Sequence, residues 1–460
     1  MKRTAAAALD DWLRAPDRKP LVLRGARQVG KTWLVRDLAA RSGRELAEVN
    51  FERDPSFARY FRTNDAAAIL GELSLALDRD ISPGRSLLFL DEIQAAAPVF
   101  GKLRWFYEEV PSLPVVAAGS LLELTLGDGH FSMPVGRVSF QHVEPMGFPE
   151  FLEAHGQPRL LRVLEEWRPG GPPLPEAAHE RATQWLHRYS MVGGMPAVVE
   201  ADASGRSARA CRELQRDLAA AFRADFAKYS GRMHPNVLDA TLRAVAGSLG
   251  RKLVYAQFGD GVKQHQARRA LELLAGARVC HLVRHSAANG LPLGAEAKDT
   301  FRKAILADVG LAHALLGTPA AARFPSWTDL APAVRGQLAD QLAGQQLRLV
   351  DALTGDGPEL FYWQRAGGRH GEVDYLVVVQ GRIVPVELRS GAAGSMKSLH
   401  QFMFDKRLDL AVRCDAKPPS VMDVSVTTTR GDPVSYRLLS LPPYLLWALA
   451  NAVAGVTASR

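Results

Sequence analysis

Short apolar segments alternate with helical patterns at the start of the chain. Residues 21–23, 86–90 and 115–118 are dense enough in apolar side chains to be strands, and the last two read as strands buried on both faces. A helix with its apolar residues on one face begins at Lys31. Strands that alternate with helices predict an α/β domain with a mainly parallel sheet over residues 1–170.

The middle of the chain is mostly helical in pattern. It follows a loop rich in proline and glycine at residues 168–175. Apolar residues keep helical spacing over 238–249 and 270–274, and the hydrophobic run 279–283 comes next. This order predicts a helical region with a small winged-helix unit over residues 171–320.

The character of the chain changes again after this helical region. A helix leads into two predicted strands, residues 373–379 and 383–388, and the Gln-Gly-Arg sequence between them predicts a tight turn. Because this segment has strands of its own, we expect residues 321–460 to form a separate α/β domain. A chain of 460 residues is long enough for about two to four domains.

A phosphate-binding loop joins the first strand to its helix. The pattern G-x-x-x-x-G-K-[ST] is formed by Gly25, Ala26, Arg27, Gln28, Val29, Gly30, Lys31 and Thr32. The glycines let successive backbone N–H groups point at phosphate oxygens, and the helix adds its positive dipole end. Lys31 would contact the β- and γ-phosphates, and the Thr32 hydroxyl would bind Mg²⁺. We therefore expect ATP with Mg²⁺ as the ligand.

Two carboxylates end the second predicted strand. Residues 87–90 are apolar, and Asp91 and Glu92 follow directly, which is the Walker B pattern. The carboxyl end of a strand is where open α/β sheets bind ligands. Asp91 would hold the Mg²⁺ shell, and Glu92 would act as the general base on the attacking water.

Two further residues are candidates for sensing the γ-phosphate. Ser120 follows the predicted strand 115–118 and would contact the γ-phosphate or the attacking water; the alternative is an ordinary Gly-Ser turn. Arg137 would supply charge to the γ-phosphate of a neighbouring subunit; the alternative is a structural salt bridge.

The positive charge of the chain is concentrated in its middle. The net charge is +8, and residues 206–284 alone have fifteen Lys or Arg against six Asp or Glu. Such an excess attracts phosphate backbones, and Lys263, Arg268 and Arg269 would contact DNA from the outer face of a recognition helix. A solvated basic helix or a protein-binding face are the alternatives.

Cysteine use and apolar run length exclude some classes of protein. The three cysteines lie far apart and show no metal-ligand spacing, so neither a disulfide framework nor a structural zinc site is expected. No apolar run approaches the ~20 residues that span a bilayer, and the N-terminal apolar run is too short for a signal peptide. We expect a cytoplasmic protein without membrane contact.

Several short motifs occur together in one order along the chain. They are the stretch 23–34, Asp91-Glu92-Ile93-Gln94, Gly119-Ser120, Gly136-Arg137-Val138, Val192-Gly193-Gly194-Met195-Pro196, Gly371-Glu372-Val373-Asp374 and the stretch 386–391. With these motifs the chain resembles the bacterial and archaeal AAA-superfamily ATP-binding proteins that have a C-terminal domain of unknown function. The resemblance implies an AAA-type ATPase core, a helical and winged-helix middle, and a restriction-endonuclease-like fold at the C-terminus.

The resemblance also implies a candidate metal site near the C-terminus. Restriction-endonuclease-like sites place an Asp on one strand and Glu-x-Lys on the next, and here Asp374 and Glu387 occupy those places, with Asp340 as a third oxygen ligand. The lysine position holds Arg389, which stays protonated and cannot replace a lysine of shifted pKa. A degenerate, non-cleaving domain is our first interpretation; active cleavage and a purely structural ion pair are the alternatives.

These features favour an ATPase switch. ATP binding and slow hydrolysis would change how the other domains engage DNA or a protein partner. An ATP-gated metal-dependent nuclease and a non-catalytic DNA-binding regulator are the alternatives. AAA-type cores often work as rings, so a homo-oligomer is a further expectation.

Overall fold

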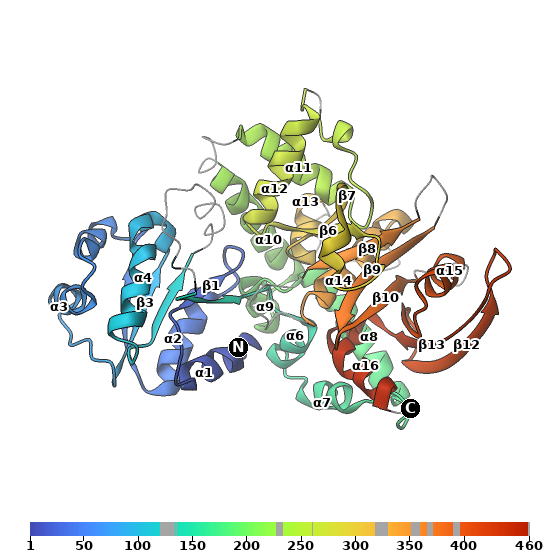
Figure 1. Cartoon of the computed structure of the whole chain (residues 1–460), viewed down its shortest axis with the longest axis horizontal. Coiled ribbons are helices and arrows are strands. Elements are labelled where there is room, and N and C mark those ends of the chain that lie inside the picture. Colours follow the sequence, from blue (N-terminus) through green and yellow to red (C-terminus); the bar gives the residue numbers. More distant parts are fainter. Residues whose placement is uncertain are drawn as a thin grey trace. The chain divides into compact units, whose positions relative to one another are not determined.

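The computed structural model describes residues 1–119, 134, 136–226, 233–259, 261–317, 330–350, 359–365, 371–389 and 396–458. It divides the chain into two compact units (Figure 1). The first contains residues 1–145 and the short stretch 272–279, and the second contains most of the rest. Among the described residues, none of the helices combines the length and the apolar character that crossing a membrane requires.

The first unit is built from alternating strands and helices. In chain order they are α1 (Ala5–Arg14), β1 (Leu21–Arg24), α2 (Lys31–Ser42), β2 (Glu45–Asn50), η1 (Pro55–Phe61), α3 (Ala66–Ala76), β3 (Ser86–Asp91), η2 (Ile93–Ala96), α4 (Ala97–Glu109), β4 (Val115–Ala118) and β5 (Ser139–His142). The strands at 21–24, 86–91 and 115–118 and the helix start at Lys31 confirm the sequence predictions. Every residue of β3 and β4 is buried, as expected for strands covered on both faces.

The five strands of the first unit form one parallel sheet in the order β2-β3-β4-β1-β5. Because all strands run in the same direction, their carboxyl ends meet at one edge. β4 lies between β1, which leads into the phosphate loop, and β3, which ends at Asp91. This order brings two motifs that are about 60 residues apart in the chain to the same edge.

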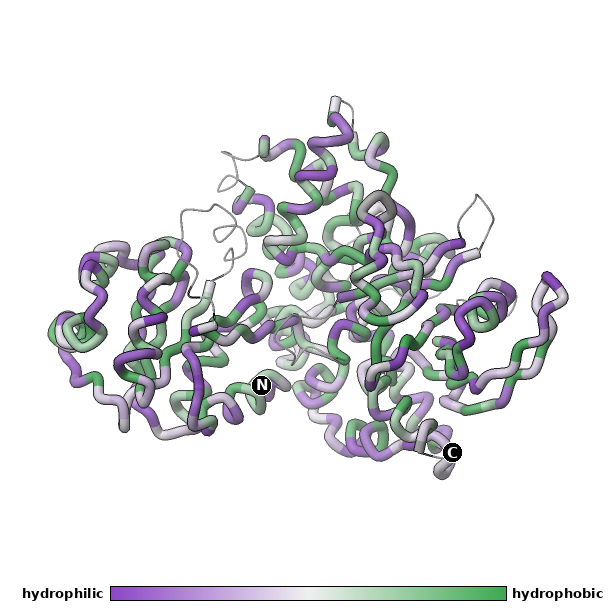
Figure 2. The backbone as a smooth tube through the Cα atoms, in the orientation of Figure 1, coloured by the Kyte–Doolittle hydropathy of each residue, from purple (hydrophilic) through white to green (hydrophobic). Residues whose placement is uncertain are grey.

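The second unit combines helices with a mixed sheet; of its helix α12, residues 272–276 are counted with the first unit. Its helices are α6 (Phe148–Ala154), α7 (Pro158–Glu166), α8 (Glu176–Val192), α9 (Pro196–Ala203), α10 (Ala208–Ala224), α11 (Pro235–Gly247), η4 (Tyr255–Gln257), α12 (Gln264–Gly276), η5 (Leu293–Glu296), α13 (Val309–Leu315), α14 (Pro332–Leu347), α15 (Lys397–Lys406), η7 (Pro443–Ala448) and α16 (Leu449–Ala458). Its strands are β6 (Cys280–Ser286), β7 (Ala297–Leu306), β8 (Leu360–Gln364), β9 (Glu372–Val379), β10 (Arg382–Leu388), β11 (Leu410–Cys414), β12 (Ser420–Thr427) and β13 (Pro433–Leu441). Figure 2 shows hydrophilic and hydrophobic stretches alternating along helices such as α11, which buries one face.

The sheet of the second unit has eight strands in the order β12-β13-β11-β10-β9-β8-β6-β7. β9 and β10 form the predicted hairpin, and Gln380 and Gly381 both have positive φ at its turn. β6 and β7 precede residue 320, yet β6 pairs with β8 in this same sheet. The expected division at residue 320 therefore does not separate two sheets.

Candidate functional site

The phosphate loop has the backbone conformation that its glycines allow. Gly25 has φ +150° and Gly30 has φ +94°. A Cβ on Gly25 would lie 2.2 Å from the carbonyl oxygen of Val143, so a larger residue would collide with backbone there. Gln28 also has a positive φ, of 63°, which is uncommon for a residue with a side chain. The loop thus holds a tight turn directly before α2, as phosphate binding requires.

Lys31 begins α2 and folds back over the loop. Its side chain is buried, and its ammonium donates hydrogen bonds to the carbonyl oxygens of Gly25 (3.0 Å) and Ala26 (2.9 Å). The charged end is therefore held within the loop itself, where it would contact the phosphates.

Arg3, near the N-terminus and outside the loop motif, also supports the phosphate loop. Arg3 is buried, and its guanidinium donates to the carbonyl oxygens of Val29 (2.6 Å) and Glu144 (2.7 Å). Hydrogen bonds from a charged donor are stronger than those between neutral groups. The segment before α1 therefore joins the phosphate loop to the residues that follow β5.

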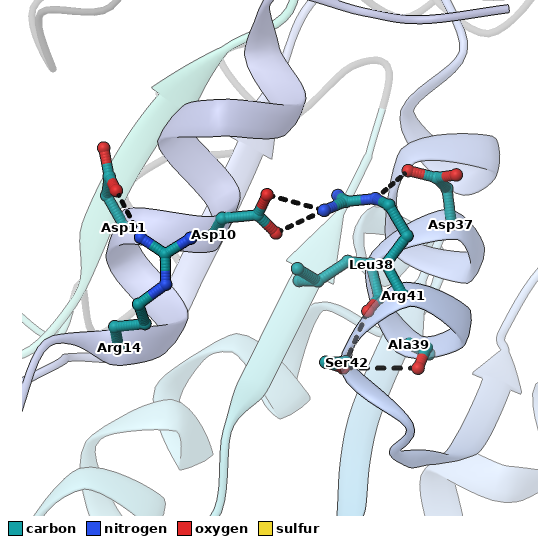
Figure 3. A network of polar contacts seen from close by, with 8 residues as sticks. All are labelled: Asp10, Asp11, Arg14, Asp37, Leu38, Ala39, Arg41 and Ser42. Carbon is teal, nitrogen blue, oxygen red and sulfur yellow. Dashed lines mark hydrogen bonds and ion pairs between the residues drawn. The ribbon is translucent and has the colours of Figure 1, made fainter.

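An arginine also connects α1 to α2 (Figure 3). Arg41 near the end of α2 donates to both carboxylate oxygens of Asp10 at 2.6 Å and to Asp37 at 2.7 Å. The hydrogen bonds to Asp10 and then to Asp37 raise the pKa of Arg41. This network holds the helix of the phosphate loop against α1.

The predicted Mg²⁺ ligands lie together at the edge of the sheet. The Thr32 hydroxyl donates to Asp91 Oδ2 at 3.1 Å, and the Asn50 side-chain amide donates to the same oxygen at 3.2 Å. Asp91 is 4% exposed; burial, with the nearby charge of Glu92, raises its pKa above the usual range. A hydroxyl and a carboxylate are ligands that Mg²⁺ accepts together with nucleotide phosphates. The residues present fit Mg²⁺ with a nucleotide. Asn50 also belongs to this site, and the sequence motifs did not predict it.

Glu92 occupies an unusual backbone conformation beside this site. Its φ of 50° and ψ of 43° lie in the left-handed region, so the chain turns sharply after β3. Its side-chain oxygen Oε2 accepts a hydrogen bond from the Gln94 amide at 2.5 Å. Glu92 and Asp91 therefore follow one another in the chain but have different partners.

The two candidate γ-phosphate sensors have different outcomes. Ser120 lies outside the described residues, and only Gly119 before it is described, as a buried residue at the end of β4. Arg137 is described and lies 2.8 Å from the Glu108 carboxylate on α4, which also accepts a hydrogen bond from Arg104. The Arg137 contact is the salt bridge of the alternative interpretation, and a role toward a neighbouring subunit stays a prediction.

The three candidate C-terminal ligands come from one helix and two adjacent strands. They are Asp340 on α14, Asp374 on β9 and Glu387 on β10. Burial raises the pKa of Asp340 to about 7 and that of Glu387 to about 8, and in both cases the charge of Asp374 adds to the rise. The Leu388 backbone N–H donates to Asp374 Oδ2 at 2.8 Å. The carboxyl groups are thus near enough to affect one another.

A buried lysine accompanies these carboxylates. Lys303 on β7 is 3% exposed, forms an ion pair with Glu372, and lies 4.9 Å from the centre of the Tyr362 ring. Its positive charge partly offsets the rise that burial causes in the pKa values of Asp340, Asp374 and Glu387. At the position where the resemblance expects a lysine, Arg389 has a buried Nε atom without a hydrogen-bond partner among the described residues. The lysine of this cluster therefore comes from a strand that the sequence analysis did not connect with it.

The geometry of these acids does not fit a metal as it stands. Across the described residues, no group of three or more histidine, cysteine, aspartate or glutamate side chains is arranged to hold a metal ion. The degenerate, non-cleaving domain therefore stays a prediction, and no metal chemistry follows from this cluster.

Comparison with known families matches three parts of the chain. Residues 17–152 match an AAA domain. This range includes the phosphate loop, Asn50, Asp91 and Glu92. Two further models match later parts of the chain: residues 183–322 match a "Domain of unknown function (DUF8612)", and residues 335–429 match a "Domain of unknown function (DUF4143)". The chain matches none of the curated proteins.

Solved structures similar to the chain include two proteins of Aeropyrum pernix. The ORC2 protein in ADPNP-ADP complexes is 12% identical, with 74% of this chain and 95% of that chain covered and a TM-score of 0.35. The ORC1 protein in complex with DNA is 14% identical, with 68% and 90% covered and a TM-score of 0.25. At these scores neither likeness carries an argument about this chain.

Beyond the AAA domain, the predicted basic helix is present as α12. Lys263 comes just before it, and Arg268 and Arg269 lie on it; all three are exposed, whereas Ala270 and Leu271 are buried. The antiparallel β6–β7 hairpin follows, and the winged-helix unit stays a prediction. Contact of this face with DNA stays a prediction.

The acidic cluster predicts a dependence of stability on pH. The folded-state pKa of Asp340, about 7, lies above the ordinary value of 3.8, so the neutral form stabilises the fold. That stabilisation is complete below about pH 4 and is lost as the pH rises through 7. A shift of this size corresponds to at most ~4 kcal/mol, less where water reaches the group.

We therefore expect Asp340→Asn, which stays neutral, to reduce the loss of stability between pH 5 and pH 8.5. Denaturant unfolding in metal-free buffer at the two pH values measures the change in the free energy of unfolding. Asp423→Asn, at an exposed aspartate, is the control. An identical pH dependence in Asp340→Asn and the unsubstituted protein would contradict this assignment.

Proposed function

We propose that this chain binds ATP with Mg²⁺, hydrolyses it slowly, and uses the nucleotide state to control how it engages a partner. The observation that carries the proposal is the hydrogen bond from Thr32 to Asp91, beside a loop that holds Lys31. It brings the two predicted Mg²⁺ ligands to the place where the phosphates would lie. The match of residues 17–152 to an AAA domain supports the same assignment.

The proposed site residues of the AAA domain have different roles in ATP hydrolysis. Lys31 and the N–H groups of the loop would bind the phosphates, and Thr32 and Asp91 would hold the Mg²⁺. Bound Mg²⁺ supplies positive charge that stabilises the phosphates in the transition state. Glu92 would take a proton from the attacking water. Ser120 and Arg137 remain proposed γ-phosphate sensors.

Removing the charge of Lys31 tests the proposal. We expect Lys31→Ala to weaken MgATP binding by about 100-fold, because a buried charged contact to the phosphates is lost. Isothermal titration calorimetry measures it, with Lys102→Ala as control; Lys102 is a surface lysine of the same unit that bonds Asn64. The proposal fails if the unsubstituted protein does not bind MgATP, or if Lys31→Ala binds it equally well.

We further propose that the nucleotide state controls the two parts of the chain after the AAA domain, residues 171–320 and 321–460. The family matches at 183–322 and 335–429 lie almost entirely within the proposed divisions 171–320 and 321–460. The exposed basic residues Lys263, Arg268 and Arg269 favour DNA as the partner. DNA affinity measured at two salt concentrations, with and without ATP, decides between DNA and a protein partner. A response that is flat in salt would exclude phosphate contacts.

A metal-dependent nuclease is a second candidate that the half-buried carboxylates of Asp340, Asp374 and Glu387 favour. Lys303 adds a buried lysine to them. We place this candidate below the switch, because the described acids are not arranged to hold a metal. Incubation of DNA with Mg²⁺ or Mn²⁺, with and without ATP, tests it. Cleavage that Asp374→Ala abolishes would reverse this order.

A further inference from the structure

Glu92 is held in a conformation that costs free energy. A residue with a side chain is disfavoured in the left-handed region, and Glu92, directly after β3, has φ 50°. Such conformations persist where the surrounding structure imposes them, and they are concentrated at functional sites.

The side chain of Gln94 contacts the Glu92 carboxylate. Gln94 lies in η2, two residues after Glu92, and its Nε2 atom donates to Glu92 Oε2 at 2.5 Å. The backbone N–H of Ala95 donates to the Glu92 carbonyl oxygen at 2.9 Å in the same turn. The orientation of the amide follows from chemistry, since the reverse orientation would place its oxygen against a carboxylate oxygen.

The other end of the same amide is unsatisfied. Gln94 Oε1 is buried and has no hydrogen-bond partner among the described residues. A buried acceptor without a donor destabilises the fold, and such groups in native structures call for an explanation. An apolar side chain of the same length would avoid this cost. The cost is explained if the Gln94 amide is needed for what its nitrogen does to Glu92.

We propose that Gln94 is a positioning residue for Glu92. Its amide fixes one carboxylate oxygen, so that the other is available to the water that attacks ATP. In that step the water oxygen bonds to the γ-phosphorus, the bond from phosphorus to the β–γ bridging oxygen breaks, and a water proton passes to Glu92. ADP and phosphate are the products. This inference rests on the proposed ATP hydrolysis and adds a residue that the Walker motifs do not include.

The substitution Gln94→Met tests the proposal, because methionine keeps the length of the side chain but cannot donate. We expect kcat for ATP hydrolysis to fall about tenfold, while the Kd for MgATP stays within about twofold, because Gln94 acts on the base and not on the phosphates. Gln94→Glu has the same shape and also cannot donate when ionised, so it should lose at least as much activity. A kcat that is unchanged or higher in both variants overturns the proposal.

A double-mutant cycle separates positioning from a merely structural role. In a Glu92→Gln background, Gln94→Met should have no further effect on the single-turnover rate, because the group on which it acts is gone. A tenfold loss in both backgrounds would show that Gln94 acts through the fold and would overturn the proposal. If the unsubstituted protein does not hydrolyse ATP, the proposed function itself has failed; if it does and the cycle is additive, only this inference has failed.

Discussion

The substitution Glu92→Gln is expected to lower kcat for ATP hydrolysis by about 100- to 10,000-fold, which is the range of a lost general base. The Kd for MgATP should stay within about twofold, because Lys31, Thr32 and Asp91 are retained and provide the phosphate and Mg²⁺ contacts. Glutamine has the shape of glutamate but cannot accept a proton from water at neutral pH. The Glu92→Gln protein is therefore expected to bind ATP and to retain it without hydrolysing it.

Single-turnover hydrolysis of labelled ATP and calorimetric binding measure the two quantities separately. Glu72→Gln is a matched control, since Glu72 is an exposed glutamate on α3 of the same unit. Equal losses of binding and of turnover would assign Glu92 to the fold of the site. Unchanged turnover would remove Glu92 as the base, and another carboxylate would have to take that role.

The parts of the site that were predictable from the sequence are those that one short segment builds. The phosphate loop is such a part, because its glycines, its lysine and its helix N-terminus are adjacent in the chain. The apolar strand before Asp91 is another, because burial on both faces leaves a continuous apolar run. The hairpin of β9 and β10 was also predictable, since a two-residue turn with positive φ suits Gln380-Gly381.

The parts that were not predictable depend on contacts between distant segments. Asn50 reaches Asp91 because β2 and β3 pair in parallel, and no local pattern marks an asparagine at a strand end as a partner of a carboxylate. Arg3 reaches the loop from the N-terminus, and Lys303 reaches the acidic cluster from β7. The pairing of β6 with β8 was likewise hidden, because the periodicity of a strand does not say which sheet it joins.

Packing in the second unit gives Val192-Gly193-Gly194-Met195-Pro196 a structural role. Gly194 donates its N–H to Asp308 Oδ2 at 2.5 Å and accepts from the Met146 N–H at 2.7 Å. A Cβ on Gly194 would lie 2.1 Å from the Met146 carbonyl oxygen, and that oxygen already accepts from the Tyr189 hydroxyl. Burial raises the pKa of Asp308, whose carboxylate also accepts from Gly310. The glycine therefore allows two backbone segments to approach within hydrogen-bond distance.

We expect Gly194→Ala to destabilise the second unit by about 3–5 kcal/mol, because backbone must move and two buried hydrogen bonds weaken. Denaturant unfolding followed by circular dichroism measures it. Gly247→Ala in α11 is the matched control: its Cβ would meet nothing within 4 Å, so alanine should be neutral or should stabilise the helix by up to ~1 kcal/mol. A Gly194→Ala protein as stable as the control would mean that the Met146 segment can move away at little cost. The close approach of the two backbone segments would then not be the reason for the glycines in this motif. A large loss confined to Gly194→Ala would instead assign the motif to holding together the fold around Asp308.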